Sequence, residues 1–317
     1  MSSEKLILTS KPLVSVVINY LNGIEFVHEA IESVIKQTYD NWEIVLYDNA
    51  SQDNLEEELK RYNSLYNIKY FKNDKTVNLA SARNKAVQKT IGEYITFLDC
   101  DDLWHEEKLF KQLESFSHEN IGCVYTNFSQ FNQKGLRKIA FSQKMPSGNL
   151  YKTIMFNDFL CFSSLMIRRK VFDLTNIHFD PVLNYVEDED FLIRLSREWE
   201  FGYVDEVLTE YRMHENSLTA KAKLEFRDEE DYLLERYSTE FDDFNEEKVN
   251  YYFNILQKNR AVTLWRMGQS REARKIMPIF ASKKFRFFLI YLLMYFDHKQ
   301  IDLIRKFFSN GPSPYET

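Results

Sequence analysis

Apolar and polar positions along the first hundred residues follow two alternating periods. Four short runs rich in β-branched and aromatic residues are typical of buried strands: Val14–Ile18, Glu43–Tyr47, Ile68–Phe71 and Tyr94–Leu98. Apolar residues at helical spacing between them predict a helix with Asn22 as its N-cap and Glu25 three residues later, and further helices over Leu55–Tyr66 and Leu79–Lys89. This order predicts an α/β fold with a mostly parallel sheet, whose ligands bind at the carboxyl ends of the strands.

The pattern changes towards the C-terminus. Strands are expected at Cys123–Phe128 and Ser163–Ile167, and a helix from about Glu187. After Thr219, charged and aromatic-rich segments predict helices over 223–242, 246–267, 270–281 and 283–309, with Gly268 as the turn of a helical hairpin. We therefore expect a catalytic domain over 1–220 and an all-helical region over 221–317.

Composition narrows the function classes. A formal net charge of -7 argues against a surface that coats nucleic acid. Three widely spaced cysteines without a C-x-x-C pair disfavour a disulfide framework or a zinc knuckle and favour a reducing compartment. The run Phe287–Phe296 has about half of the ~20 residues that a spanning helix needs. We expect a cytoplasmic protein, with peripheral contact to a membrane left open.

Three carboxylates follow the strand at Tyr94–Leu98: Asp99, Asp101 and Asp102. If the chain stays extended, Asp99 and Asp101 share a face while Cys100 turns towards the core. Carboxylates aimed together repel each other unless a cation lies between them, and Mg²⁺ or Mn²⁺ prefers such oxygen ligands. The alternative is a solvated acidic turn.

Two further polar residues lie at or near strand ends. Asp48 follows a buried strand, so its carboxylate is a candidate acceptor for a nucleobase imide; the alternative is an Asx-turn. Arg83 has small neighbours, which would let it lean towards the strand ends and bind a diphosphate or ribose; the alternative is an ordinary solvated arginine. No G-x-G-x-x-G or P-loop occurs, which disfavours dinucleotide dehydrogenases and P-loop kinases.

The acidic helix start at Glu187 holds a candidate general base. Asp188 lies one turn before the inward-facing Phe191 and Leu192, whereas Asp190 faces Arg194 at i+4 and is expected to form an exposed pair. The alternative for these acids is stabilisation by the helix dipole. Downstream, His214 is a candidate imidazole ligand for the metal held by Asp101, or a structural histidine.

These segments together resemble the family 2 glycosyltransferases of the GT-A fold, over about residues 12–220. Asn19 stands where that family usually has proline. The segments that carry the resemblance, in chain order, are Val14–Asn22, Ala30–Tyr39, Tyr47–Asp53, Ala82–Asn84, Asp99–Asp102, Glu187–Asp188 and Tyr211–His214.

The resemblance implies an inverting transfer of a sugar from a nucleoside diphosphate, with UDP favoured, to a glycan or lipid-linked acceptor in surface-polysaccharide biosynthesis. A Mn²⁺ or Mg²⁺ ion held by Asp101, Asp99 and His214 would stabilise the leaving diphosphate, and Asp188 would be the base. The donor would be bound by Tyr20, Asn22, Asp48, Arg83, Asp99 and Asp102. Trp104 and Glu187 are expected at the sugar or acceptor pocket, with a core position as the alternative for Trp104.

Other functions stay open. A sugar nucleotidyltransferase would need a glycine-rich, lysine-containing loop after the first strand, which Tyr20–Gly23 is not. The non-enzymatic alternative is a degenerate scaffold, that is, a GT-A domain that has lost catalysis and serves as a binding partner. Such a protein would not need intact carboxylates. The C-terminal region is expected to pack on the catalytic domain, to form a homodimer, or to contact a membrane through about 283–308, where basic residues precede an apolar run.

Overall fold

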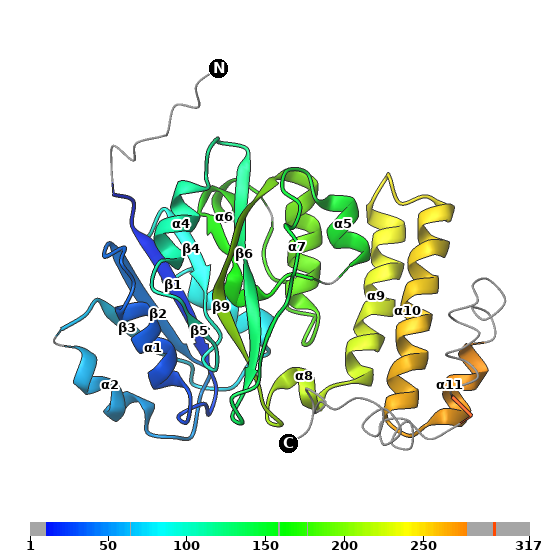
Figure 1. Ribbon diagram of the computed structural model, residues 1–317, viewed down its shortest axis with the longest axis horizontal. Helices are drawn as coiled ribbons and strands as arrows, with labels where there is room; N and C mark the ends of the chain where they lie inside the picture. The colour runs from blue at the N-terminus through cyan, green and yellow to red at the C-terminus, as the bar shows by residue number, and fades with distance from the viewer. Residues whose placement is uncertain (1–10, 64, 158, 176, 278–293, 296–317) are drawn as a thin grey trace. The chain divides into compact units, whose positions relative to one another are not determined.

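The computed structural model of the protein describes residues 11–63, 65–157, 159–175, 177–277 and 294–295. The chain divides into two compact units, residues 1–213 and 214–317. The first unit is built on one mixed sheet with helices on both faces, and the second is helical (Figure 1).

The sheet of the first unit has the strand order β3-β2-β1-β4-β8-β6-β9-β5, and β7 pairs with β6. The first four strands are parallel, β8 is antiparallel to both β4 and β6, and β6 is parallel to β9. The bounds are β1 (Val14–Tyr20), β2 (Trp42–Asp48), β3 (Ile68–Lys72), β4 (Tyr94–Phe97), β5 (Leu103–Trp104), β6 (Ile121–Asn132), β7 (Arg137–Ile139), β8 (Met166–Arg168) and β9 (Glu200–Met213).

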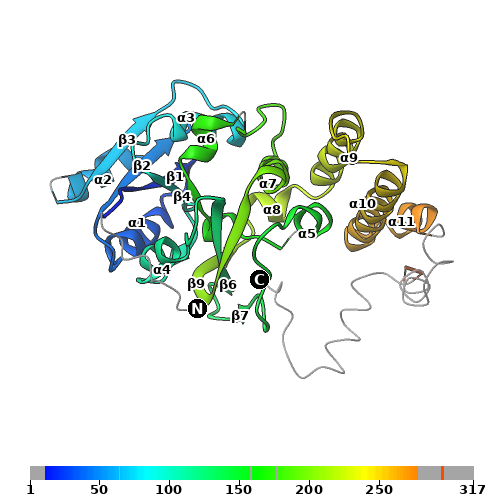
Figure 2. The same cartoon turned by 90° about the horizontal axis from the view of Figure 1, so that it is seen from above.

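Helices cover the two faces of this sheet (Figure 2). On one face, α1, α2 and α4 contribute Val27, Leu55 and Leu109 to the main apolar core. On the other lie α3, α6 and α7, where Phe179 stacks on Phe191 (4.5 Å between ring centroids). The bounds are α1 (Val27–Ile35), α2 (Leu55–Asn63), α3 (Leu79–Val87), α4 (Lys108–Glu114), α5 (Tyr151–Phe156), η1 (Phe162–Ser164), α6 (Lys170–Leu174) and α7 (Glu187–Glu198).

The predicted α/β class and the parallel pairing of the first four strands are confirmed, two local expectations are wrong, and one strand is missing from the prediction. Helix α1 begins at Val27 rather than after Asn22, which adopts a left-handed conformation (φ 52°) in the preceding loop. Residues Ser163–Ser164 form the short helix η1 rather than a strand. The 14-residue strand β9 was not predicted, because outward-facing Asp205 and Glu206 and its register shifts against β6 break the apolar alternation.

The directions of the strands determine where a site can form. Strand β6 is antiparallel to β8, which is antiparallel to β4, so β6 and β9 run in the same direction as β1, β2 and β4. The carboxyl ends of all these strands therefore meet at one edge of the sheet, which we call the carboxyl edge. In α/β sheets, ligands bind at this edge.

The second unit contains α8 (Leu218–Lys221), α9 (Leu224–Glu240), α10 (Glu246–Arg266) and α11 (Ser270–Ile276). The predicted hairpin at Gly268 is confirmed, because α10 and α11 lie on either side of this residue and contact each other. The φ of Gly268 is +80°, a conformation that glycine adopts readily. A small core of Ala261, Leu264, Trp265, Ala273, Met277 and Met294 holds this part together. The predicted helix over 283–309 lies outside the described residues, apart from Met294 and Tyr295. Within the described part of the chain, no helix is both long and apolar enough to cross a membrane.

Candidate active site

Asp48 closes β2 at the carboxyl edge and is fully buried. Its carboxylate accepts hydrogen bonds from the Ser51 backbone N–H (2.7 Å) and the Tyr70 hydroxyl (2.7 Å), and Lys72 Nζ lies 3.4 Å away. Burial alone would raise the pKa of Asp48, but these bonds and the lysine charge outweigh it and lower the pKa. The Asp48 carboxylate therefore holds the turn after β2 through the N–H three residues on, and contact with a nucleobase stays a prediction.

The loops after β1 and β2 are bonded to each other. The Asn22 N–H donates to Ser51 Oγ (3.0 Å), and the Gln52 N–H donates to Asn22 Oδ1 (2.9 Å). Tyr20 is buried, and its hydroxyl donates to Asp53. Tyr20 and Asn22 thus hold the shape of the loops, and their predicted contact with the nucleoside stays a prediction.

The carboxylates after β4 lie in a turn, which we call the acid turn (Asp99–Asp102). The extended alternation that we expected is wrong, because the Asp102 N–H donates to the Asp99 carbonyl (3.0 Å) and bends the chain. Cys100 still packs against the apolar core, as expected, and burial followed by the neighbouring carboxylates raises the pKa of its thiol. Asp99 and Asp101 remain partly exposed at the carboxyl edge.

Asp102 differs from the other two acids of the turn because its side chain is buried. It accepts hydrogen bonds from the Ser163 hydroxyl (2.6 Å) and the Arg212 backbone N–H (2.9 Å). Burial and repulsion from Asp101 and Asp99 raise the pKa of Asp102 well above its ordinary value. The carboxylate of Asp102 therefore joins the acid turn to η1 and β9, and its predicted contact with the donor stays a prediction.

Arg83 on α3 is buried between two acids from distant parts of the chain. Its Nη1 donates to Glu187 Oε1 (2.6 Å) and its Nη2 lies 3.4 Å from Asp99 Oδ1. The guanidinium sits over the ring of Phe162, 4.1 Å from the centroid. Arg83 therefore connects the acid turn to the start of α7, and the solvated-arginine alternative is wrong. A direct contact of Arg83 or Glu187 with substrate stays a prediction.

Asp188 lies half-buried in the first turn of α7. Its negative charge raises the pKa of both Asp99 and Glu187, so the three acids are close enough to repel one another. Asp190 pairs with Arg194 as expected (2.5 Å), but it is buried rather than exposed, because Arg194 also donates to the His178 carbonyl (2.5 Å). Asp190 is thus bound in an ion pair, whereas the role of Asp188 as the general base stays a prediction.

Glu187 predicts a measurable dependence of stability on pH. Burial raises the pKa of Glu187 from 4.5 to about 8, with Arg83 opposing and Asp188 adding to the shift. Between these values the folded protein binds a proton that the unfolded chain does not, so stability falls as the pH rises from about 4.5 to 8. We expect Glu187→Gln to flatten this fall in thermal melts across that range. Parallel Tm–pH curves for the two proteins would contradict the expectation.

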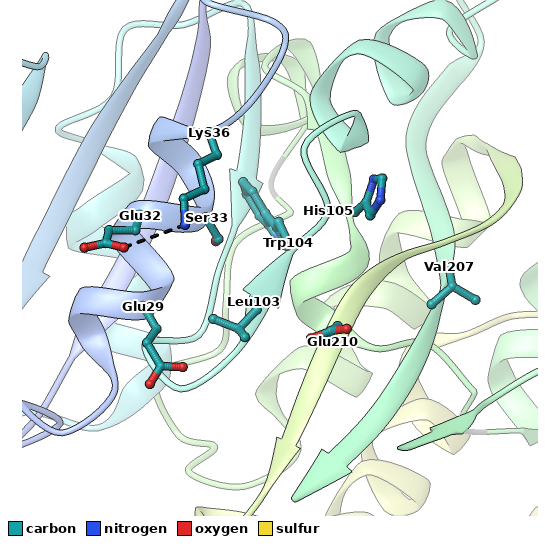
Figure 3. Close-up of a pocket in the computed structure, with 9 residues that line it drawn as sticks. All are labelled: Glu29, Glu32, Ser33, Lys36, Leu103, Trp104, His105, Val207 and Glu210. Carbon is teal, nitrogen blue, oxygen red and sulfur yellow. Dashed lines mark ion pairs between the residues drawn. The ribbon is translucent and has the colours of Figure 1, made fainter. Parts of the chain in front are cut away.

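Trp104 on β5 is buried, and its Nε1 donates to the Ser163 carbonyl (2.8 Å). This burial favours the core position over a sugar-pocket floor. Trp104 also lines a groove of about 320 Å³ between α1, β5 and β9, whose other lining residues are Glu29, Glu32, Ser33, Lys36, Leu103, His105, Val207 and Glu210 (Figure 3). Asp99, Arg83 and Asp188 are not among these residues, so we do not assign the sugar pocket to this groove.

Tyr211–His214, the last of the segments that carry the family resemblance, is divided between the two units. Arg212 on β9 donates its Nε to the Asp101 carbonyl (2.7 Å) and an Nη to Glu29 (2.7 Å). His214 follows β9 and is the first residue of the second unit. Its predicted role as a metal ligand stays a prediction.

The chemistry of the acid turn fits a divalent cation. Burial and the charges of Asp101 and Asp188 raise the pKa of Asp99 against the opposing effect of Arg83, although 38% of its side chain is exposed. Among the described residues, no three His, Cys, Asp or Glu side chains are grouped to hold a metal ion. Mg²⁺ is commonly held by one or two carboxylates together with substrate phosphates, so Asp99 and Asp101 are a suitable donor pair.

Sequence reasoning missed the segment that supports the acid turn. Ser163 Oγ accepts from the Asp99 N–H (3.1 Å) and donates to Asp102, while Gln112 Nε2 donates to the Ser164 carbonyl (2.8 Å). Lys108 is fully buried and donates to Gln112 Oε1 (2.7 Å). The sequence shows these residues only as polar positions that come after the acid turn. Nothing in their spacing indicates that they bind that turn.

Residues 15–174 match the family model described as Glycosyl transferase family 2. The chain belongs to glycosyl transferase family 2. The predicted enzyme class, a glycosyltransferase, is thereby confirmed. The family match covers the loops after β1 and β2, the acid turn and η1.

Several curated relatives of this glycosyltransferase have names that state an activity. TuaG of Bacillus subtilis, named for teichuronic acid biosynthesis, is 28% identical over 213 residues, covering 66% of this chain and 82% of TuaG. WfaP of Escherichia coli, named as a UDP-Glc:alpha-D-GlcNAc-diphosphoundecaprenol beta-1,3-glucosyltransferase, is 28% identical over 211 residues, covering 66% of this chain and 80% of WfaP. The chain spans only 20% to 23% of three longer Rickettsia glycosyltransferases.

Solved structures share the fold of this glycosyltransferase. Staphylococcus aureus TarS 1-349, in complex with UDP-GlcNAc, has a TM-score of 0.63 at 17% identity, covering 90% of this chain and 87% of that chain. The mannosyltransferase PcManGT from Pyrobaculum calidifontis, in complex with GDP-Man and Mn²⁺, has a TM-score of 0.59 at 15% identity, covering 87% and 77%. The predicted GT-A fold with C-terminal helices is confirmed.

Proposed function

We propose that this glycosyltransferase moves a sugar from a nucleoside-diphosphate sugar to a hydroxyl of a glycan or lipid-linked saccharide in cell-surface polysaccharide biosynthesis, inverting the anomeric carbon. The observation that carries the proposal is the convergence of the acid turn and the start of α7 on the buried Arg83. The names of TuaG and WfaP refer to surface polysaccharides or a lipid-linked acceptor, and those of WfaP and TarS refer to UDP-sugars, which favours UDP here.

The donor would lie along the carboxyl edge. The bonded loops after β1 and β2, with Tyr20, Asn22 and Asp48, would hold the nucleoside. The diphosphate would approach Asp99 and Asp101, which would hold a Mn²⁺ or Mg²⁺ ion. When bound, that ion supplies positive charge that stabilises the leaving diphosphate.

Asp188 would act as the general base. Its carboxylate would accept the proton of the acceptor hydroxyl while the hydroxyl oxygen attacks the anomeric carbon from the face opposite the diphosphate. The bond between the anomeric carbon and the diphosphate oxygen breaks as the new glycosidic bond forms, and one in-line displacement inverts the centre. Arg83 would hold Asp99 and Glu187 in place, so that the two ends of this reaction keep their spacing.

Nucleotide titration with and without Mn²⁺ tests the donor site directly. We expect metal-dependent binding of UDP, and Asp101→Ala should weaken it roughly 10- to 100-fold, because it removes one of two charged ligands. Asp173→Ala, which removes an exposed acid from α6, is the matched control and should bind like wild type.

The same titration with dTDP and GDP would identify the base. It also tests the degenerate-scaffold alternative, which predicts no metal-dependent nucleotide binding. The match to glycosyl transferase family 2 argues against the nucleotidyltransferase alternative. The cytoplasmic location, a homodimer and membrane contact through 283–308 stay predictions, and that last segment lies almost wholly outside the described residues.

A further inference from the structure

Arg212 on β9 holds one peptide group of the acid turn. Its backbone N–H donates to Asp102 Oδ1 (2.9 Å), and its side-chain Nε donates to the Asp101 carbonyl (2.7 Å). That carbonyl belongs to the peptide group between Asp101 and Asp102, whose N–H donates to the Asp99 carbonyl (3.0 Å). Both polar groups of this peptide are bonded, so it cannot rotate without losing a hydrogen bond. The direction in which the Asp101 side chain leaves the backbone is thereby restricted.

The Arg212 guanidinium is itself held by three residues outside the acid turn. Its Nη2 donates to Glu29 on α1 (2.7 Å), a residue drawn in Figure 3. The guanidinium also lies over the rings of Phe26 (4.9 Å) and Phe131 (4.5 Å). A planar group that is bonded along its edge and stacked on rings has a fixed orientation, which a flexible ammonium would not have. Arg212 therefore connects the acid turn to α1 and β6.

Two simpler roles for Arg212 fit these contacts less well. An ion pair with Glu29 contributes little by itself, because 57% of the Glu29 side chain is exposed. A direct contact with the donor diphosphate would need an accessible guanidinium. However, only 8% of the Arg212 side chain is exposed, and its Nε is already bonded to the Asp101 carbonyl. The contacts thus favour a role that acts through the acid turn.

Arg212 complements the support that Ser163 gives to the first residue of the acid turn. Ser163 Oγ accepts from the Asp99 N–H (3.1 Å), whereas Arg212 binds the Asp101 carbonyl. The side chains of Asp99 and Asp101 both stay partly exposed at the carboxyl edge. A divalent cation shared by two carboxylates needs them at a set spacing, and groups that orient metal ligands commonly determine how tightly the metal binds.

We propose that Arg212 is a positioning residue for the metal. By fixing the peptide group between Asp101 and Asp102, it holds the Asp101 carboxylate at the spacing from Asp99 that a divalent cation needs. The inference rests on the proposed function, which assigns that cation to Asp99 and Asp101. It adds a residue that contacts neither the metal nor the nucleotide and still sets the affinity for the metal.

Titration of the full chain with UDP at a series of Mn²⁺ concentrations tests the proposal. The quantity to compare is the Mn²⁺ midpoint, the Mn²⁺ concentration that gives half-maximal UDP binding. Arg212→Met should raise this midpoint about 10- to 100-fold, the usual effect of removing a group that supports a metal ligand. At saturating Mn²⁺, the affinity for UDP should return to within a few-fold of wild type, because the loops after β1 and β2 are unchanged.

Arg137→Met is the matched control. Arg137 also lies over the Phe131 ring (5.8 Å), but it pairs with Glu210 rather than with the acid turn. The control should keep the wild-type Mn²⁺ midpoint.

Arg212→Lys separates positioning from stability. Lysine keeps a positive charge beside Glu29 and most of the apolar stem, so its melting temperature should lie closer to wild type than that of Arg212→Met. Its ammonium cannot bind Glu29 and the Asp101 carbonyl in one plane, so its Mn²⁺ midpoint should stay high. Thermal melts of the same samples give the comparison.

Three results would overturn the inference while leaving the proposed function intact. One is a folded Arg212→Met protein with the wild-type Mn²⁺ midpoint. Another is a midpoint that recovers in Arg212→Lys together with the melting temperature. The third is a loss of UDP affinity that saturating Mn²⁺ does not restore. Wild type without metal-dependent UDP binding would instead overturn the proposed donor site, and this inference with it.

Discussion

Asp188→Asn should reduce sugar transfer by about 10²- to 10⁴-fold, the usual contribution of a general base. An amide cannot accept the acceptor proton, yet it keeps the size and shape of the side chain. Binding of the nucleoside diphosphate should stay close to wild type, because the proposed mechanism assigns Asp188 to the acceptor and not to the nucleotide. Single-turnover transfer and nucleotide titration on the same preparation would separate the two effects.

Glu189→Gln is the control for this substitution. Glu189 is the next residue of α7 and is also half-buried, so the change removes one negative charge from the same helical turn. It should leave turnover within a few-fold of wild type. Wild-type turnover in Asp188→Asn, or an equal loss in both variants, would show that Asp188 is not the base.

Above pH 8, where Glu187 is ionised, Arg83→Met should destabilise the first unit by about 3–5 kcal/mol, because it leaves the buried Glu187 carboxylate without its counter-charge. Denaturant unfolding measures this loss. Arg137→Met, which breaks an ion pair whose arginine side chain is 61% exposed, is the control and should cost about 1 kcal/mol or less. Arg83→Met with wild-type stability would contradict a role in holding the two acids together.

A double substitution distinguishes lost pairing from lost packing. Arg83→Met/Glu187→Leu replaces the pair with apolar side chains of similar size and should recover much of the stability lost in Arg83→Met. Transfer activity should not recover with it, because Asp99 still lacks the guanidinium. Equal recovery of both would mean that Arg83 acts on the reaction only through stability.

The parts of the site that follow local periodicity could be predicted from the sequence. Buried strands ending in polar residues correctly placed Asp48 and Asp99 at strand ends, and helical spacing placed Asp188 at a helix start and paired Asp190 with Arg194. These inferences depend on residues within a few positions of each other, where side-chain direction follows from the backbone period. The acid turn is the exception, since the strand period does not show where an extended chain stops.

The burial and the partners of these residues could not be predicted in the same way. Arg83 and Glu187 are separated by 104 positions, and Asp102 and Ser163 by 61. Such pairs form because the order of strands in the sheet brings distant segments together, and that order cannot be read from a single sequence. A buried and a solvated arginine therefore look alike in the sequence, and a donor ligand looks like a structural carboxylate.

The late position of β9 in the chain has a consequence for biosynthesis. The Arg212 N–H that binds Asp102 is made 110 residues after it, whereas β1 to β4 are complete by Phe97. During translation, the part from β1 to β4 can order first, because its pairings join near neighbours in the chain. The hydrogen bond from Arg212 to the acid turn can form only after Arg212 has left the ribosome. A nascent chain can therefore order the loops after β1 and β2 well before its acid turn is fixed, and we expect activity only once β9 has been made.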